Sequence, residues 1–517
     1  MDTPLDVLVV GAGPTGLVLA LALVKQGARV RVVDAAAEPG TTSRALAVQA
    51  RTLELYRALG LADDVVRRGL VLGAVNLWNH GERVAHVELG AIGRGSSPYP
   101  FGLIFPQDEH ERLLIERLSA LGVRVERPTE LDTFEASDHG VTATLRARGG
   151  DVERCEAAYL AGCDGARSRV RALVGAEFPG GTYEHLFYVA DVEARGAVMD
   201  KELHVMLDDA GFLALFPLAA DGRARLIGTV REDAAHRADK LGWDDVDRAP
   251  VTRAGLDVAR VNWFSTYRVH HRVASRFRAG RAFLLGDAAH IHSPVGGQGM
   301  NTGIGDAVNL AWKLAAVTSG RARADVLDTY EPERISFARR LVATTDRAFQ
   351  AATSDGAVAR VVRTRILPRL VGRITKTEIG ERLLFRAVSQ IGITYRTSAW
   401  SEGRARSVHA GDRLPWVAPS NGGDDDNYTP LGALDWQLHV YGGAPAELVH
   451  RCASRGLPIH AFLLDDAAVA AGLRADHAYL VRPDGYLGAV FPLSEAGDRL
   501  ADYLDRHEIQ PRPRAVD

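Results

Sequence analysis

The sequence predicts an α/β fold of about three domains, and three observations lead to this prediction. The chain has 517 residues, which at roughly 150 residues per domain allows about three of them. The stretch from Leu5 to Asp34 reads as a strand, a glycine-rich turn, an apolar helix and a second strand. Residues 72–105 and 181–271 have a strand-like character, and strands alternate with helices again after residue 430. We therefore expect a Rossmann-like domain, an inserted mixed β-sheet and a C-terminal domain.

The composition is that of a globular, enzyme-sized protein. Apolar residues make up 46% and charged residues 25%, and the formal net charge is −3. A chain so close to neutrality has no field that would gather nucleic acid or an anionic membrane, so neither is expected as a partner. Cys155, Cys163 and Cys452 form no C-x-x-C motif or Cys/His cluster. This excludes a disulfide framework and a structural zinc site, and favours a reducing cytoplasm. The apolar run Val7 to Val24 is interrupted by glycines and follows acidic residues, which argues against a targeting or membrane segment.

The first motif is GAGPTG, which lies between the first strand and the helix. In such a unit Gly11 permits the tight turn, Gly13 lets a pyrophosphate approach the backbone, and Gly16 allows close packing of helix on strand. Asp34 closes the second strand near the spacing of a carboxylate that binds an adenosine ribose. FAD and NAD both carry this ADP half, so the motif alone does not separate them. The contacts expected of it are Gly11, Gly13, Pro14, Thr15, Gly16 and Asp34.

Two later segments bear on that choice. In AGCDGARSRVR a strand ends, Asp164 begins a turn and a basic helix follows. In GDAAHIHSPVGGQGMNTG, Asp287 follows a strand end, where a carboxylate can accept hydrogen bonds from a sugar-alcohol chain such as ribitol. The loop Pro294 to Gly299 lacks bulky side chains, so backbone can lie against a flat ring. A helix that begins near Met300 would stabilise negative charge on a reduced flavin through its dipole.

These three segments, in this order and spacing, resemble the class A flavoprotein aromatic hydroxylases, the para-hydroxybenzoate and phenol hydroxylase family. The resemblance implies that FAD is the cofactor, that Asp287 holds the ribitol, and that Gly297 to Asn301 lines the isoalloxazine. Arg44, in TSRALAVQART, and Gln107, in FPQDEHERLL, resemble family stretches that contact the diphosphate and ribityl region. The further cofactor contacts expected are therefore Arg44, Gln107, Asp164, Gly286, Asp287, Pro294, Gly297, Gly299, Met300 and Asn301.

Two of these positions have an alternative interpretation. Asp287, His290 and His292 form D-x-x-H-x-H and could be drawn as metal ligands, but no third cluster of acids or histidines accompanies them, so no metal is expected. Asp164 and Arg167 either form a surface ion pair or contact FAD or the pyridine nucleotide, as the resemblance implies. The sequence leaves these two readings of Asp164 open.

The remaining segments are assigned by their position between the motifs. Alternating and apolar runs in the inserted segments indicate a mixed sheet, which in the family covers the substrate opposite the flavin. Phe212, Leu213, Phe216 and Trp263 could line it, with Pro294 from the cofactor loop, although each aromatic residue taken singly fits sheet core better. The boundaries expected are 1–71, 106–180 and 272–397 for the FAD-binding domain with a helical extension, 72–105 and 181–271 for the substrate-binding domain, and 398–517 for the C-terminal domain.

The C-terminal segment resembles the thioredoxin-like tail of the larger phenol and aromatic polyketide hydroxylases. Its Cys452 has no C-x-x-C partner, so thiol redox chemistry is not expected. We expect the tail to serve packing or the contact between two subunits of a homodimer, with a regulatory role as the alternative.

The resemblance also implies a reaction. NAD(P)H reduces FAD, dioxygen adds to give a flavin 4a-hydroperoxide, and its distal oxygen is transferred to a phenolic, polycyclic polyketide-type substrate. Only one dinucleotide fingerprint is present, so NAD(P)H is expected to bind transiently. His270, His271 and Tyr267 are candidates for the proton step, but each fits a structural role equally well, and no catalytic residue is assigned. Baeyer–Villiger oxidation, epoxidation and a non-catalytic flavin-binding role remain alternatives.

Overall fold

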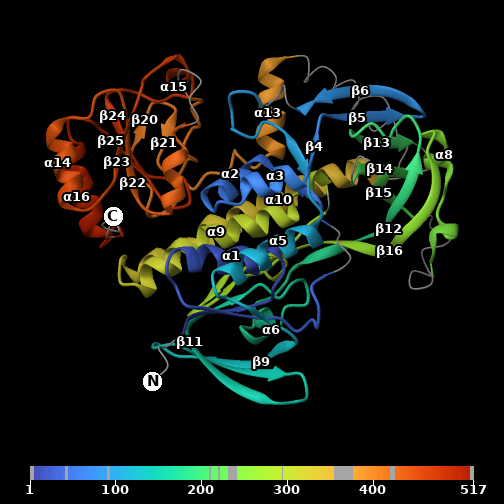
Figure 1. Cartoon of the computed structure of the whole chain (residues 1–517), viewed down its shortest axis with the longest axis horizontal. Helices are drawn as coiled ribbons and strands as arrows, with labels where there is room; N and C mark the ends of the chain where they lie inside the picture. Colours follow the sequence, from blue (N-terminus) through green and yellow to red (C-terminus); the bar gives the residue numbers. More distant parts are fainter. Residues whose placement is uncertain are drawn as a thin grey trace.

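The structure is a computed structural model, and it describes residues 5–40, 45–89, 93–208, 211–218, 222–230, 241–293, 295–353, 377–419 and 425–512. These residues form two eight-stranded sheets, a four-stranded sheet and smaller ones. Helices α9 (Gly299–Thr318) and α10 (Tyr330–Thr353) cross the middle of the molecule, with the three main sheets arranged around them (Figure 1). Among the described helices, none combines the length and apolar character needed to cross a bilayer.

The first sheet contains the predicted nucleotide-binding unit. Strand β1 pairs in parallel with β2 on one side and with β11 on the other, and β11 pairs in parallel with β18. Helices α1 (Pro14–Lys25) and α5 (Gln107–Ala120) cover this sheet. Five of the six β1 residues are buried, as expected for a parallel strand covered on both faces. The strands are β1 (Leu5–Val10), β2 (Val30–Val33), β8 (Val125–Glu126), β9 (Thr129–Ala136), β10 (Val141–Ala147), β11 (Val152–Gly162), β17 (Arg278–Ala279) and β18 (Ala282–Leu284).

The second sheet is built from both inserted segments. Its order is β19-β16-β12-β15-β14-β13-β5-β6, in which β13 and β5 are parallel and the other neighbours antiparallel. The predicted mixed sheet is therefore confirmed, and β19 brings in the cofactor segment at one edge. The strands are β5 (Ala74–Asn79), β6 (Glu82–Glu88), β12 (Gly180–Arg195), β13 (Leu203–Asp208), β14 (Gly211–Pro217), β15 (Arg223–Thr229), β16 (Asp257–Val273) and β19 (His290–Ile291).

The C-terminal segment forms a four-stranded sheet of order β23-β22-β24-β25. Strands β22 and β23 are parallel and joined by α14, whereas β24 and β25 form an antiparallel hairpin followed by α16. The segment is thus a βαβ unit followed by a ββα unit, and the thioredoxin-like assignment of this tail stays a prediction. Cys452 is fully buried and burial raises the pKa of its thiol to about 11, so this thiol stays protonated. The elements are β22 (Gln437–Tyr441), α14 (Ala446–Ser454), β23 (Ile459–Phe462), α15 (Asp466–Ala470), β24 (His477–Val481), β25 (Leu487–Pro492) and α16 (Ala496–Arg506).

Shorter elements connect these layers. Strands β3, β7 and β4 form a three-stranded sheet, and β20 pairs with β21. The remaining elements used below or visible in Figure 1 are β3 (Ala47–Val48), α2 (Ala50–Ala58), α3 (Ala62–Arg68), β4 (Leu70–Leu72), β7 (Gly102–Ile104), α6 (Arg169–Leu173), α8 (Ala249–Arg253), α13 (Glu378–Val388), β20 (Arg404–Ala405) and β21 (Val408–His409).

Buried charges hold the C-terminal domain against the cofactor domain. Arg482, beside the β24–β25 turn, lies 2.9 Å from Glu333 of α10 and 2.6 Å from Asp484, and Lys313 of α9 lies 2.8 Å from Glu333. All four side chains are at most 2% exposed. Burial alone would raise the pKa of Glu333, but the charges of Arg482 and Lys313 outweigh it and hold the pKa well below its usual range. The contact of the C-terminal domain with α9 and α10 is therefore as buried as the protein interior.

Replacing Arg482 by methionine should lower the free energy of unfolding by about 3–5 kcal/mol, because it leaves Glu333 and Asp484 as buried, incompletely paired charges. Urea denaturation of the full chain measures this loss. Arg455→Met is the control, since the Arg455–Asp505 pair is exposed and its loss should change the free energy of unfolding far less. Equal losses in the two variants would contradict a buried, interior-like interface.

Candidate functional site

The glycine turn after β1 has three positions with different constraints. Gly11 has φ +104°, and a Cβ there would lie 2.3 Å from the carbonyl oxygen of Cys163. A Cβ on Gly16 would lie 2.0 Å from the carbonyl oxygen of Gly11. By contrast, no atom of the described chain lies within 4 Å of a Cβ built on Gly13. The first and third glycines are thus required by close packing, while the second faces open space where a pyrophosphate can lie.

The start of α1 is suited to an anion. Pro14 is its first residue, and no side chain caps its N–H groups, because the N-cap position is Gly13. Asp34, at the end of β2, accepts hydrogen bonds from the backbone N–H of Ala12 at 2.6 Å and of Ala36 at 2.8 Å. Arg127 Nη1 lies 3.0 Å from Oδ1 of this carboxylate, the oxygen that also accepts from Ala36. The pair fixes Asp34 beside the turn, and Arg127 is a site residue that no sequence motif marks.

Asp164 begins the turn that follows β11. Its carboxylate accepts hydrogen bonds from the hydroxyl of Ser168 at 2.6 Å and from the backbone N–H of Val170 at 3.0 Å, so it supports Ser168, the N-cap residue of the short helix α6. Within the described chain, no ion pair joins Asp164 to Arg167. The ion-pair reading is therefore wrong, and contact with a nucleotide stays a prediction.

The segment after β18 approaches the same place. Asp287 stands exposed on a single turn of 3-10 helix, Gly286–Ala288. A Cβ on Gly286 would lie 2.7 Å from the hydroxyl oxygen of Thr15, and one on Gly303 of α9 would lie 2.3 Å from it. Because β1, β11 and β18 are parallel, their carboxyl ends lie at one edge of the sheet. The three predicted segments, including Thr15, Asp164 and Asp287, are thus brought to one edge of the sheet.

The glycine loop before α9 is held by the side chain of Asn301. Gly296 and Gly297 have φ of +75° and +62°, so both need the left-handed region. The amide of Asn301 donates to the carbonyl oxygens of Ala47 at 2.9 Å and Gly297 at 2.7 Å, and it accepts from the backbone N–H of Gln49 at 2.9 Å. These hydrogen bonds occupy the amide of Asn301, and its contact with a flavin ring stays a prediction.

The other predicted cofactor contacts lie in different local environments. Gly299 and Met300 are the first two residues of α9, and Met300 is half-buried against the cofactor core. Gln107 begins α5 and donates to Glu111 at 2.8 Å. Arg44 and Pro294 lie outside the residues that the structure describes.

Two buried polar atoms beside the glycine loop fit a ligand with a polar edge. His292 donates from Nδ1 to the carbonyl oxygen of Ser293 at 2.9 Å, which makes Nε2 an acceptor. Burial lowers the pKa of His292 to about 4, so the ring is neutral at neutral pH. Neither His292 Nε2 nor the hydroxyl of Ser293 has a partner in the described structure. Since buried polar atoms normally have partners, these residues fit the heteroatom edge of an isoalloxazine.

The alternative metal set does not assemble. His290 is turned toward α9, where its Nε2 lies 2.7 Å from Asp306. The group with metal-ligand spacing found among the described residues is Asp200, Glu202 and His204, on the second sheet. His204 already accepts a hydrogen bond from Trp78 and contacts Asp200 at 2.8 Å. The histidines of D-x-x-H-x-H are therefore not arranged as a ligand set.

The predicted aromatic residues share one face of the second sheet, here called the near face. Side chains alternate along a strand, and Phe212 and Phe216 of β14 point to the same side. Phe212 packs against the buried cluster of Tyr183, Phe187 and Val269. Phe216 packs against the buried cluster of Leu46, Leu72 and Ile104, and Ala47 packs against the same cluster. A Cβ on Gly297 would lie 2.6 Å from the Cβ of Ala47. The near face therefore adjoins the glycine loop.

Leu213 was expected on this face and is not. It is fully buried with Leu215, Tyr188 and Leu226 in a core on the opposite side of the sheet. Trp263 is opposite Asp191 in the register of β12 and β16, so it belongs to the near face together with Tyr267. The expectation for Leu213 is wrong because its neighbour Phe212 takes the near side, and a strand cannot present two consecutive side chains to one face.

The near face has a polar part at each end. Arg225 of β15 makes two hydrogen bonds to Asp191, at 2.6 and 2.7 Å, with its guanidinium 5.7 Å from the ring centre of Trp263. At the other end the ring of His271 lies 4.8 Å from that of Tyr183 in a tilted arrangement, and its Nδ1 is buried without a partner in the described structure. His270 points to the opposite side and contacts the hydroxyl of Thr182 at 2.7 Å. Of the two histidine candidates for the proton step, His271 therefore lies on the near face, and its catalytic role stays a prediction.

Comparison with known proteins agrees with this arrangement. The model of the family described as FAD binding domain matches residues 4–345. The chain is 35% identical over 516 residues to the 6-methylpretetramide 4-monooxygenase of Streptomyces rimosus, covering 94% of this chain and 90% of the relative. The solved anhydrotetracycline hydroxylase from Streptomyces rimosus superposes with a TM-score of 0.78 and 31% identity, covering 99% of this chain and 100% of that one. A ternary complex of aklavinone-11 hydroxylase with FAD and aklavinone has a TM-score of 0.78 and 25% identity, covering 98% and 100%.

Gly13→Ala should leave folding unchanged but weaken binding of FAD by about tenfold or more, since the methyl group would occupy the space of the pyrophosphate. The apoprotein melting temperature and the dissociation constant of FAD, followed by quenching of flavin fluorescence, measure the two effects. Gly432→Ala is the matched control, because Gly432 also has open space and an ordinary φ but lies in the C-terminal domain. Unchanged FAD affinity in Gly13→Ala would contradict this placement of the dinucleotide.

Proposed function

Because the chain belongs to the FAD-binding family of flavoprotein monooxygenases, we propose that it hydroxylates a phenolic, polycyclic aromatic substrate of the polyketide type, with NAD(P)H as transient reductant and dioxygen as co-substrate. The cofactor is FAD. The observation that carries the proposal is that an aromatic sheet face adjoins the glycine loop where the flavin ring is expected. The printed substrates of the relatives, among them 6-methylpretetramide and aklavinone, support the polycyclic class.

FAD supplies hydride acceptance and oxygen activation, so the protein has to bind and tune it. Helix α9 starts at the glycine loop with no acidic residue in its first turn and no capping side chain. Its positive dipole end is therefore available to stabilise negative charge on the reduced ring system, by about 0.3–1 kcal/mol at an exposed helix end and more when buried. We assign Asp287 to the ribityl chain, and its exposure on the turn that follows β18 supports this role.

The near face supplies the orientation of the substrate. Phe212, Tyr267 and Trp263 are half-buried aromatic side chains on this face, which suits a flat fused-ring molecule because large apolar faces are removed from water on stacking. The carboxylate of Asp191, held in place by the buried Arg225, offers a hydrogen-bond acceptor to the hydroxyl groups of such a molecule. Nδ1 of His271, which is buried without a hydrogen-bond partner in the described structure, is our candidate contact for the phenolic hydroxyl, whose loss of a proton makes the ring more nucleophilic.

Anaerobic mixing of the purified holoenzyme with NADH or NADPH should bleach the flavin absorption at roughly 450 nm. An aromatic polyketide substrate should accelerate this reduction. With labelled dioxygen, mass spectrometry should then find one labelled oxygen on an aromatic carbon. Oxygen inserted into a ring or placed in an epoxide would instead identify the Baeyer–Villiger or epoxidising reaction. Absence of reduction with either nucleotide, at every substrate tested, would indicate a flavin-binding protein without this activity.

Phe212→Leu should raise the KM of the substrate several-fold, because it removes stacking area worth about 0.5–1.5 kcal/mol from the near face. Phe264→Leu is the matched control, since Phe264 is also half-buried on the second sheet but stacks on Tyr188 at the opposite face. The measurement is substrate-stimulated oxidation of NAD(P)H by both variants at several substrate concentrations. The placement of the substrate fails if the two variants show the same KM.

A further inference from the structure

The turn that carries Asp287 is held from behind by one buried carboxylate. Asp306, on α9, accepts hydrogen bonds from the backbone N–H of Gly286 at 3.0 Å and from Nε of Arg334 at 2.6 Å, and it lies 2.7 Å from Nε2 of His290. The side chains of Asp306, Arg334 and His290 are 1% exposed. Burial alone would raise the pKa of Asp306, but the charge of Arg334 outweighs it and lowers the pKa, so the carboxylate is ionised. The shape of the turn that carries Asp287 thus depends on the carboxylate of Asp306.

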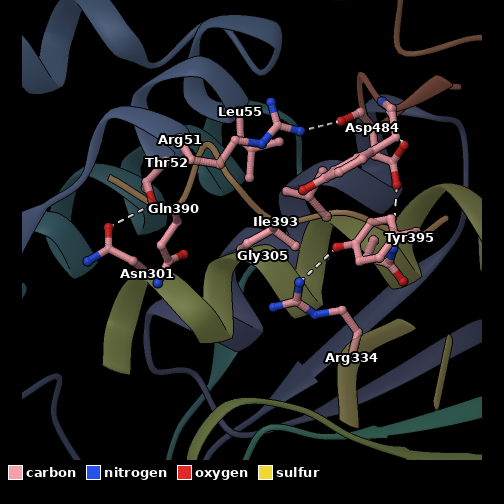
Figure 2. A pocket seen from close by; sticks show the side chains of 13 residues that line it. Arg51, Thr52, Leu55, Asn301, Gly305, Arg334, Gln390, Ile393, Tyr395 and Asp484 are labelled. Atoms are coloured by element: carbon pink, nitrogen blue, oxygen red, sulfur yellow. Dashed lines mark hydrogen bonds between the residues drawn. The ribbon is translucent and has the colours of Figure 1, made fainter. Parts of the chain in front are cut away.

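Arg334 connects Asp306 to the segment that leads into the C-terminal domain. Its Nη2 donates to the carbonyl oxygen of Thr302 at 3.0 Å, and its Nη1 donates to the hydroxyl of Tyr395 at 2.8 Å. Figure 2 shows Arg334 and Tyr395 pointing toward each other beside a small cavity that Asn301 and Asp484 also line. A buried guanidinium needs an acceptor for each of its donors, and Tyr395 supplies one of them.

Tyr395 in turn rests on the C-terminal domain. Its ring packs on that of Tyr486, with centroids 4.3 Å apart, and its backbone N–H donates to the carbonyl oxygen of Gly411 at 2.6 Å. Tyr486 follows the turn between β24 and β25, the same turn whose Asp484 accepts a hydrogen bond from the indole of Trp312 at 3.1 Å. The hairpin therefore contacts both the aromatic support of Arg334 and the helix that begins at the glycine loop.

Helix α9 carries a buried row of polar residues that depends on these contacts. Thr302, Asp306, Asn309 and Lys313 recur at the spacing of one helix face, and all four are buried. Buried polar and charged side chains of this kind destabilise a protein unless each has its hydrogen-bond or ion-pair partners. The partners come from α10 and, through Tyr395 and Arg482, from the C-terminal region.

We propose that Tyr395 is a positioning residue for the FAD site, acting through Arg334 and Asp306 on the turn that carries Asp287, and that the C-terminal domain thereby sets how tightly FAD is held. This deepens the proposed function, because it concerns the same cofactor site, but it rests only on FAD binding and not on the reaction catalysed. It gives the tail a role that its buried, protonated Cys452 does not supply.

The test compares two buried tyrosine hydroxyls in the full-length protein. Tyr395→Phe removes the acceptor of Arg334, whereas Tyr503→Phe removes the hydroxyl that donates to the carbonyl oxygen of Trp400 at 2.7 Å, away from this path. Both side chains are almost fully buried, so the melting temperatures should fall by similar amounts. The dissociation constant of FAD should rise about fivefold in Tyr395→Phe and stay within about twofold of the parent in Tyr503→Phe. The visible circular dichroism of bound FAD should change in Tyr395→Phe alone. Equal FAD affinities in the two variants would overturn the proposal.

A double-mutant cycle adds a second, independent readout. Arg334→Lys keeps a positive charge near Asp306 but loses the geometry that reaches Thr302 and Tyr395 together. If the path is as proposed, adding Tyr395→Phe to Arg334→Lys should weaken FAD binding no further, because the contact is already lost. Strict additivity of the two effects would refute it. Since FAD binding is measured without substrate, failure of this test is distinguishable from absence of the monooxygenase reaction.

Discussion

The constraint on which this structure depends is the close approach of backbone to backbone around Thr15. A side chain at Gly11, Gly286 or Gly303 would collide with Cys163 or with the hydroxyl of Thr15. These contacts bring the turn after β1, the turn after β18 and helix α9 close together. Because the strands are parallel, their carboxyl ends already lie at one edge, which is where such sheets bind dinucleotides. The open space at Gly13, beside this crowding, is where the proposed pyrophosphate would lie.

A second consequence concerns the helix that begins at the glycine loop. Its first turn faces the cofactor site, whereas its later turns carry a buried polar stripe that contacts α10 and the C-terminal hairpin. Buried ion pairs contribute little net stability compared with apolar packing, but they strongly disfavour arrangements in which one partner is missing. Glu333, shared by Lys313 and Arg482, therefore specifies one docking of the C-terminal domain more than it strengthens the fold. A domain that looks separate along the chain is in this way joined to the cofactor helix.

The second sheet divides its two faces between packing and recognition. One face, with Leu213, Leu215 and Tyr188, is an ordinary apolar core. The other carries aromatic rings between the Asp191–Arg225 pair and His271, and it meets the loop around Ala47. The alternation of side chains along the strands produces this division without any special motif. A flat aromatic substrate placed between this face and the flavin ring would be shielded from water on both sides, which suits chemistry that must avoid loss of activated oxygen.

The sequence by itself determined the cofactor fold, because its turns contain residue types that few other backbone conformations require. GAGPTG between two strands, the aspartate after β18 and the glycine loop before α9 each state a local backbone requirement, and local requirements can be read along the chain. The tertiary structure alone decided which side chains serve them. Arg127 beside Asp34, the hydrogen bond from Asn301 to Ala47, the exclusion of Leu213 from the near face and the path from Tyr395 to Asp306 all join residues far apart in sequence. Such pairings depend on which elements pack together, and packing is a property of the assembled layers rather than of any one segment.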